Sequence, residues 1–346
     1  MDRLTIITPD DWHLHLRDTP YLEAVVHDSA RQFGRAIIMP NLNPPVRSVE
    51  DALAYRQRIL AALPEDSGFQ PLMTLYLTDN TRVADIEAAS ESPYIFGAKL
   101  YPAGATTNSE SGVTDLARLD QVFEAMQKHR FMLQVHGEAT GPEVDVFDRE
   151  KVFIEKSLER IRRDFPELPI VFEHITTLDA VDYVRTADAN LAATITPHHL
   201  LINRNAIFLG GIRPHHYCLP VAKREIHRQA LIAAALSGDA RFFAGTDSAP
   251  HSKQAKESAC GCAGIYSAHS ALELYAEAFE RGGDFTHFEA FMSRHGADYY
   301  GLPYNQGQTR LERQPWTLPE SLPYPDSGLI PFRAAETLNW KQILDD

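Results

Sequence analysis

Short apolar runs alternate with longer amphipathic stretches along the first 300 residues of the chain. Runs of this length, bounded by turn-forming residues, are typical of buried strands. Eight of them predict strands: Trp12–Leu16, Arg35–Met39, Pro71–Leu77, Ile95–Leu100, Phe131–Val135, Pro169–Glu173, Leu191–Thr196 and Arg241–Gly245.

The stretches between these runs carry apolar residues at helical spacing. Ser48 and Asp51 have the spacing of a capping box, and an apolar stripe continues to Leu63. Similar stripes follow Leu116 and Leu158. Eight alternations of strand and helix predict an α/β fold of the TIM (β/α)8 barrel type. A doubly wound open sheet is the alternative, but no Gly-x-Gly-x-x-Gly follows the first strand and no phosphate-binding loop appears.

The segment after Gly301 has a different composition, because six prolines interrupt it. Proline favours extended chain. We therefore expect one barrel domain over residues 1–346, in which about residues 302–346 form a Pro-rich tail packed on the barrel.

Composition narrows the class of protein. With 44% hydrophobic residues and a net charge of −14, the 346-residue chain has a globular core and no basic patch for nucleic acid. Residues 1–9 lack the apolar centre of a signal peptide, and no apolar run is long enough to span a membrane. The three cysteines form no Cys-x-x-Cys pair. We therefore expect a protein of the reducing cytoplasm that binds neither nucleic acid nor membrane.

His13 and His15 lie at the end of the first predicted strand, in Asp-Trp-His-Leu-His-Leu-Arg. Side chains at positions i and i+2 of a strand point to the same face, so the two imidazoles can meet at one divalent metal. His-x-His also occurs on solvated strands, and the pair alone does not decide between the two interpretations.

Further metal-competent residues follow other predicted strands. In a parallel barrel, functional groups gather where the strands end. Each of these residues alone could be a hydrogen-bonded structural residue or a turn residue. Together with the first pair, they place candidates at one rim of the barrel: Lys99 from strand four, His136 from strand five, His174 from strand six and Asp247 from strand eight. Since this set is complete, the pairs His198-His199 and His215-His216 are interpreted as structural.

Lys99 is unusual because it lies within an apolar run, where a bare ammonium is costly to bury. It could extend outward to water or pair with a carboxylate. Alternatively, desolvation favours the neutral amine, which can react with carbon dioxide to form a carbamate. The carbamate has two oxygens and one negative charge, so it can bridge two cations.

This set of residues resembles the binuclear amidohydrolase superfamily, and within it the shorter, monofunctional bacterial dihydroorotases. Four stretches carry the resemblance: residues 11–17 (DWHLHLR), 39–45 (MPNLNPP), 97–108 (GAKLYPAGATTN) and 245–251 (GTDSAPH). The resemblance implies a zinc-dependent hydrolase of a cyclic amide C–N bond. The reaction would be the reversible cyclisation of N-carbamoyl-L-aspartate to L-dihydroorotate plus water, a step of de novo pyrimidine (UMP) biosynthesis.

The resemblance also implies two zinc ions per subunit, with cobalt or manganese as possible substitutes. His13, His15 and Asp247 would hold the more buried ion, and His136 and His174 the more exposed one. Lys99, carbamylated by carbon dioxide to N6-carboxylysine, would bridge both. A metal-bridged hydroxide would attack the ring carbonyl, and Asp247 would act as general base and then as general acid.

Dihydroorotate carries a carboxylate, and Arg17 is in phase with the two histidines, so its guanidinium can bind that group in the barrel mouth. A salt bridge between Arg17 and Asp18 is the structural alternative. The family pattern adds further substrate-binding residues: Asn41, His251 and the backbone of Leu219 and Ala263. It also makes Thr106 and Thr107 part of a mobile loop that closes over the substrate.

The main alternative is a cyclic amide hydrolase of the dihydropyrimidinase, hydantoinase or allantoinase type, whose uncharged rings give Arg17 no partner. A scaffold protein without activity would be expected to lose metal ligands. The family further suggests a homodimer.

Overall fold

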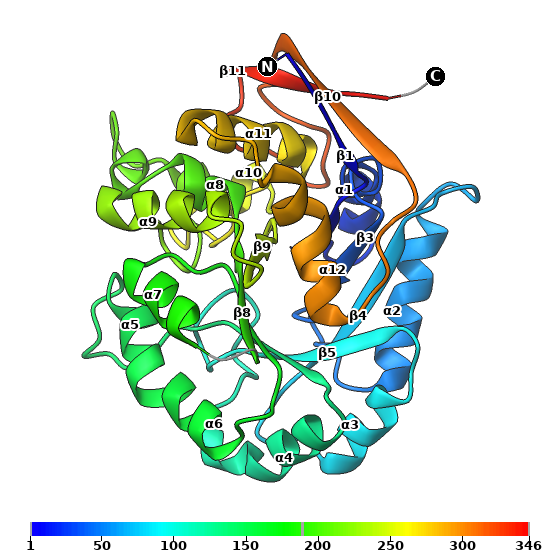
Figure 1. Cartoon of the computed structure of the whole chain (residues 1–346), viewed down its shortest axis with the longest axis vertical. Helices are drawn as coiled ribbons and strands as arrows, with labels where there is room; N and C mark the ends of the chain where they lie inside the picture. The colour runs from blue at the N-terminus through cyan, green and yellow to red at the C-terminus, as the bar shows by residue number, and fades with distance from the viewer. Residues whose placement is uncertain (1, 188–189, 345–346) are drawn as a thin grey trace.

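Eight parallel strands form a barrel in which neighbouring strands follow the order of the sequence (Figure 1). The computed structural model describes residues 2–187 and 190–344. A bridge between Leu14 and Ser248 joins the first barrel strand to the segment after the last. The predicted TIM barrel is confirmed, and each of the eight barrel strands begins and ends within two residues of its predicted run. The barrel strands are β2 (Asp10–Leu14), β3 (Arg35–Ile38), β4 (Gln70–Tyr76), β5 (Ile95–Leu100), β6 (Met132–Val135), β7 (Ile170–Phe172), β8 (Leu191–Ile195) and β9 (Phe242–Ala244).

Helices surround the barrel, and the second of them begins as the sequence predicts. Ser48 Oγ accepts a hydrogen bond from the Asp51 amide at 3.1 Å, and the Asp51 carboxylate accepts one from the Ser48 amide. No helix within the described residues has the length and apolar character that a membrane span requires. The helices are α1 (Tyr21–Ala30), α2 (Val49–Ala61), α3 (Val83–Ser90), α4 (Asp120–Lys128), α5 (Arg149–Phe153), α6 (Glu159–Asp164), α7 (Leu178–Thr186), α8 (Pro197–Leu201), α9 (Glu225–Leu236), α10 (Lys253–Lys256), α11 (Ala271–Gly282) and α12 (His295–Tyr300).

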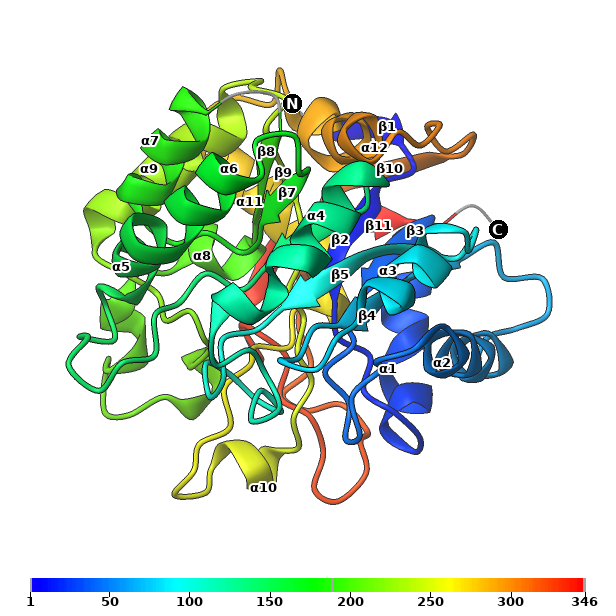
Figure 2. The ribbon, with the colours of Figure 1, turned by 90° about the horizontal axis from the view of Figure 1, so that it is seen from below.

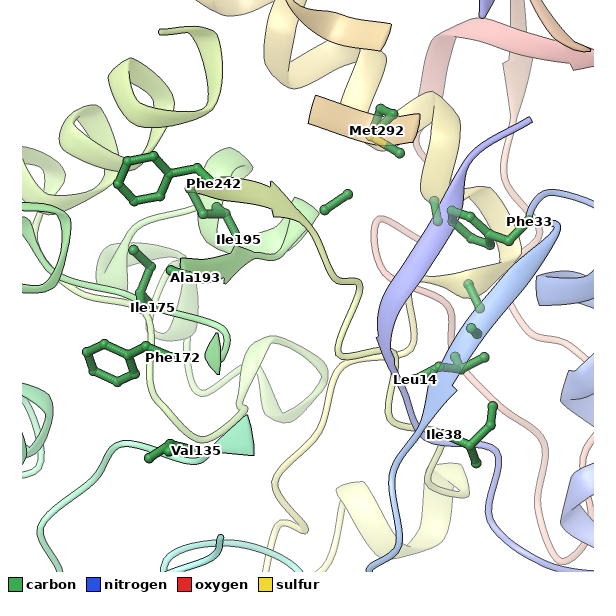
Figure 3. Packing of buried hydrophobic residues seen from close by; sticks show 14 of the residues in the cluster. Leu14, Phe33, Ile38, Val135, Phe172, Ile175, Ala193, Ile195, Phe242 and Met292 are labelled. Carbon is green, nitrogen blue, oxygen red and sulfur yellow. The ribbon is translucent and has the colours of Figure 1, made fainter. Parts of the chain in front are cut away.

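Successive residues of the barrel strands pack into two separate cores. Phe172 and Phe242 belong to the large core between strands and helices, part of which is drawn in Figure 3. Their neighbours Val171 and Phe243 belong to a smaller cluster with Trp12. This alternation follows from the two-residue period of a strand, which turns every second side chain into the barrel.

Helix α12 covers the end of the barrel where the strands begin. Trp12 stacks on Tyr300 with ring centroids 4.6 Å apart, and the Tyr299 hydroxyl donates to the carbonyl of Ile170, the first residue of β7. The side chains at the opposite end, where the strands finish, are therefore the ones available for chemistry.

The chain ends form a second sheet, which the sequence did not predict. Strand β10 (Gln308–Thr317) pairs antiparallel with both β1 (Arg3–Ile7) and β11 (Thr337–Ile343). The segment between β10 and β11 reaches the end of the barrel where the parallel strands finish, and there it lies beside α10 (Figure 2). There the Lys253 amide donates to the carbonyl of Gly328 at 2.8 Å.

Candidate active site

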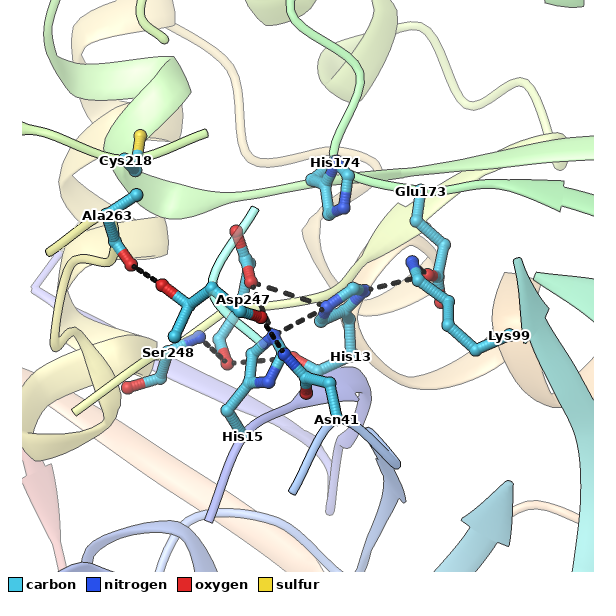
Figure 4. A network of polar contacts seen from close by, with 12 residues as sticks. His13, His15, Asn41, Lys99, Glu173, His174, Cys218, Asp247, Ser248 and Ala263 are labelled. Atoms are coloured by element: carbon cyan, nitrogen blue, oxygen red, sulfur yellow. Dashed lines mark hydrogen bonds and ion pairs between the residues drawn. The ribbon is translucent and has the colours of Figure 1, made fainter. Parts of the chain in front are cut away.

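The six residues predicted as metal ligands come together at the end of the barrel where the strands finish, and five of them are labelled in Figure 4. All six side chains are buried, although their sequence positions span more than 200 residues. These residues are His13, His15, Lys99, His136, His174 and Asp247.

His13, His15 and Asp247 present three ligand atoms to one point. The two Nε2 atoms lie 3.2 Å apart, and Asp247 Oδ1 lies 3.3 Å from His13 Nε2 and 3.1 Å from His15 Nε2. Ligand atoms bound tetrahedrally at zinc distances are about 3.3 Å apart. The donor set and its spacing therefore fit a divalent metal ion.

An irregularity in β2 directs His13 into the barrel. The register between β2 and β3 shifts between Asp11 and Leu14. Trp12 packs in the inner core, yet the next side chain, His13, also faces the interior, toward Asp247. A bulge permits two successive residues to point the same way, which a regular strand does not.

A second group of donors adjoins the first. The ring of His174 lies 4.9 Å from that of His13 and 4.8 Å from that of His136, centroid to centroid. Glu138 lies 3.0 Å from His136 Nε2, so a metal would use Nδ1 of this ring. Carboxylate partners of this kind orient ligand histidines in metal sites.

The electrostatics of the site keep the imidazoles of His13 and His174 neutral. Burial and the nearby Lys99 lower the pKa of His13 to about 3, and the same two causes lower the pKa of His174 well below its ordinary value. A neutral imidazole has a lone pair to offer a cation. The Nδ1 atom of His174 is also buried without a hydrogen-bond partner among the described residues.

Lys99 is completely buried and contacts Glu173, which is equally buried. The same Glu173 oxygen lies 3.1 Å from His13 Nδ1. Burial lowers the pKa of Lys99 well below its ordinary value. The sequence analysis left two structural alternatives for Lys99, extension to water and pairing with a carboxylate. The contact with Glu173 is the second of these, and the buried side chain does not reach water.

Three site residues have a left-handed backbone conformation that residues other than glycine rarely adopt. The φ angles of Arg17, His174 and Asp247 are 62°, 43° and 45°. Each such conformation destabilises the folded state by about 1–3 kcal/mol and persists only where surrounding contacts hold the backbone. The amide of His174 donates to Thr194 Oγ1 at 2.7 Å, and that of Asp247 donates to the carbonyl of His13 at 2.9 Å.

Arg17 is not paired with Asp18, which was its structural alternative. The Asp18 carboxylate instead accepts two hydrogen bonds from Arg58, at 2.8 and 2.9 Å. Arg17 donates to the carbonyl of Pro250 at 3.0 Å, and its Nη2 lies 2.9 Å from His251 Nε2. Arg17 and His251 line a cavity of about 420 Å³. No carboxylate among the described residues forms a salt bridge with Arg17, which leaves its charge available to an anionic ligand.

The loop that contains Thr106 and Thr107 connects two sides of the site. Asn41 donates to the carbonyl of Thr107 at 3.0 Å, and Thr107 Oγ1 donates to the carbonyl of Ala263 at 3.2 Å. The Thr106 amide donates to Ser109 Oγ within the loop. Leu219 directly follows the buried Cys218. A hydrogen bond from the Gly264 amide to the Tyr217 carbonyl links the segment of Leu219 to that of Ala263.

Comparison with known proteins agrees with this geometry. The model of the Amidohydrolase family matches residues 5–310. The chain is 63% identical to the dihydroorotase of Cupriavidus pinatubonensis over 339 residues, which cover 98% of each chain. It belongs to the dihydroorotase family. Among solved structures, the dihydroorotase of Campylobacter jejuni is 37% identical with a TM-score of 0.90, over 99% of this chain and 98% of that one. The dihydroorotase of Saccharomyces cerevisiae, solved in complex with 5-fluoroorotic acid, is 31% identical with a TM-score of 0.90, over 99% of each chain.

Several residues of this dihydroorotase-family site were missed by the sequence analysis. Glu173 ends an apolar run and directly precedes His174, a position that could have marked it as inward-facing. Glu138 lies only two residues after His136, a separation that could have marked it as a partner of that ring. Tyr324 and Asp326 line the cavity from the C-terminal segment, and no local pattern indicates this.

A further buried group in this family member has the residue types of a metal site, namely His198, His199 and Cys218. The ring nitrogens of His199 already face Thr196 Oγ1 at 2.8 Å and the carbonyl of Pro220 at 3.0 Å. Both ring nitrogens of His198 are buried without a hydrogen-bond partner in the described part of the chain.

Proposed function

We propose that this chain catalyses the reversible cyclisation of N-carbamoyl-L-aspartate to L-dihydroorotate plus water, as a cytoplasmic enzyme of pyrimidine biosynthesis. Identity of about 60% to dihydroorotases over nearly the whole chain supports this function. The observation that carries the choice of substrate is Arg17, a cation without a described carboxylate partner that lines the cavity. A carboxylate on the ring gives this guanidinium a partner, whereas an uncharged ring does not.

The proposed cofactor is a pair of zinc ions, for which cobalt or manganese could substitute. His13, His15 and Asp247 would hold one ion, and His136 and His174 the other. When bound, such a pair supplies Lewis acidity for the ring carbonyl and a hydroxide near neutral pH.

Asp247 is the proposed general base and acid. Burial alone would raise the pKa of Asp247, but hydrogen bonds from His13 and His15 lower it well below its ordinary value. The carboxylate is therefore ionised at neutral pH and can accept a proton from the attacking water. In the hydrolytic direction it then delivers this proton to the departing amide nitrogen, and synthesis reverses both transfers.

Lys99 is the proposed site of carbamylation. Because burial favours its neutral amine, the nitrogen lone pair can attack carbon dioxide, forming an N–C bond and releasing one proton. The product, N6-carboxylysine, is an anion with two oxygens that can lie between two cations.

The remaining residues are proposed to bind and enclose the substrate. Arg17, Asn41 and His251 would hold its carboxylate, and the backbone of Leu219 and Ala263 would contact the ring. Thr107 is hydrogen-bonded to both Asn41 and Ala263. From this position Thr106 and Thr107 would exclude water from the bound substrate. We also propose that the subunits form a homodimer.

The test is turnover of L-dihydroorotate by zinc-loaded protein, with dihydrouracil, hydantoin and allantoin assayed in parallel. Turnover of dihydroorotate alone is the expected result. Preference for an uncharged ring would refute the role of Arg17 and favour a hydantoinase-type activity. Absence of turnover with metal bound would refute the enzymatic function.

A further inference from the structure

Lys256 is a buried ammonium whose hydrogen bonds all go to the backbone. The side chain is 2% exposed and lies at the end of α10. Its Nζ donates to the carbonyls of Tyr217 at 2.8 Å, Cys262 at 2.7 Å and Gly264 at 2.7 Å. An ammonium has three N–H donors, so these three carbonyls saturate it. Hydrogen bonds from a charged donor are shorter and about twice as strong as neutral ones.

The three carbonyls belong to the two backbone segments that are proposed to contact the substrate ring. Tyr217 lies two residues before Leu219, and Cys262 and Gly264 flank Ala263. These segments follow different barrel strands, β8 and β9, and the Lys256 side chain joins them in addition to the hydrogen bond from the Gly264 amide to the Tyr217 carbonyl.

The contacts of Lys256 also determine where the Ala263 carbonyl points. The carbonyls on either side of it are turned toward Lys256. The Ala263 carbonyl instead accepts from Thr107 Oγ1 at 3.2 Å and lies 3.0 Å from His251 Nε2. Loss of the ammonium would leave three carbonyls without this donor and loosen the segment, which would shift the Ala263 carbonyl.

The charge of Lys256 adds to that of Arg17. Burial lowers the pKa of Lys256 to about 8, so the side chain remains protonated at neutral pH. Its described contacts are carbonyls and the ring of Tyr217, 5.6 Å away. Since no carboxylate among these contacts neutralises it, its field acts on the anionic substrate from behind Ala263.

We infer that Lys256 is a positioning residue of the substrate pocket, which holds the backbone around Leu219 and Ala263 in the arrangement that binds the anionic ring. The inference rests on the proposed function. It assigns the effect of Lys256 to substrate binding and not to the metal centre, because all of its described contacts lie on the pocket side.

The experiment compares Lys256→Met with Lys253→Met, since Lys253 is an exposed lysine of the same helix. For Lys256→Met we expect kcat/KM for dihydroorotate to fall on the order of 10²-fold, mainly through KM, with unchanged zinc content. Lys253→Met should match the wild type. A wild-type protein that does not turn over dihydroorotate would refute the proposed function itself, and a wild-type KM in folded Lys256→Met would refute only this inference.

Chemical rescue distinguishes positioning from general stabilisation. In Lys256→Ala, propylammonium can occupy the space of the removed side chain and should lower KM several-fold, whereas propanol should not. Lys256→Gln, which keeps two N–H donors without the charge, should have an intermediate KM. Loss of zinc together with kcat at constant KM would overturn the inference, as would failure of all three variants to fold, because Lys256 would then be a residue of the fold.

Discussion

Lys99, one of the six predicted metal ligands, contacts Glu173, and both side chains are completely buried. Glu173 compensates the charge that an unmodified Lys99 would carry in this apolar interior. Carbamylation would replace the amine that burial favours with an anion, and the attraction between the two side chains would be lost. Glu173 would then retain His13 as its neighbour, since its Oε2 already lies 3.1 Å from His13 Nδ1.

Glu173→Gln should weaken metal binding through His13. A neutral amide interacts with the His13 ring more weakly than a carboxylate does, and loss of such partners lowers metal affinity about 10- to 100-fold. Zinc titration of the metal-free protein measures this affinity. Glu257→Gln is the control, because Glu257 is an exposed carboxylate that also contacts a histidine, His215. Equal zinc affinity in the two variants would contradict the role of Glu173.

Lys99→Met should abolish almost all activity, because methionine fills the space of Lys99 but cannot form a carbamate. In the wild type, metal-free protein reconstituted with zinc in carbon dioxide-depleted buffer should stay inactive until bicarbonate is added. Turnover assays and intact-protein mass spectrometry follow both effects. Full turnover of Lys99→Met, or activation of the wild type without bicarbonate, would refute the carbamate.

Arg17→Met should lower kcat/KM for dihydroorotate about 10²- to 10³-fold, equivalent to about 3–4 kcal/mol, because the substrate carboxylate loses its charged partner. Zinc content should not change, since Arg17 lies outside the metal cluster and its described hydrogen bonds reach Pro250 and His251. Steady-state kinetics and metal analysis on one preparation give both values. Parallel losses of zinc and activity would indicate a structural role instead.

His198→Leu should remove part of the acid sensitivity of folding. Burial lowers the pKa of His198 to about 4, whereas an unfolded histidine titrates near 6.5. Between these values the unfolded state binds a proton that the folded state does not, so wild-type stability falls as the pH drops. Relative to the variant, the wild type should lose about 3 kcal/mol between pH 7 and pH 4. Urea unfolding of metal-free protein at several pH values measures this, and parallel curves would contradict the prediction.

Much of the fold follows from patterns within single segments. Each barrel strand is a short apolar run, and α2 begins at a capping box formed by Ser48 and Asp51, so local spacing is sufficient to place them. The pairing of β1 with β10 was missed because it joins residues about 300 positions apart, such as Leu4 and Leu311. Strand β11 lies in the Pro-rich tail and joins this sheet through β10, for example by pairing Thr337 with Thr317. Only the folded chain brings such partners together.

The candidate site divides in the same way. The sequence by itself predicted which side chains gather at one rim, because His13, His15, Arg17 and Asp247 lie at or just after the ends of barrel strands. Tertiary structure alone decided what surrounds them. It pairs Asp18 with Arg58, so that the charge of Arg17 stays available. Contacts of this kind depend on packing between residues far apart in the sequence, so no local pattern of residues predicts them.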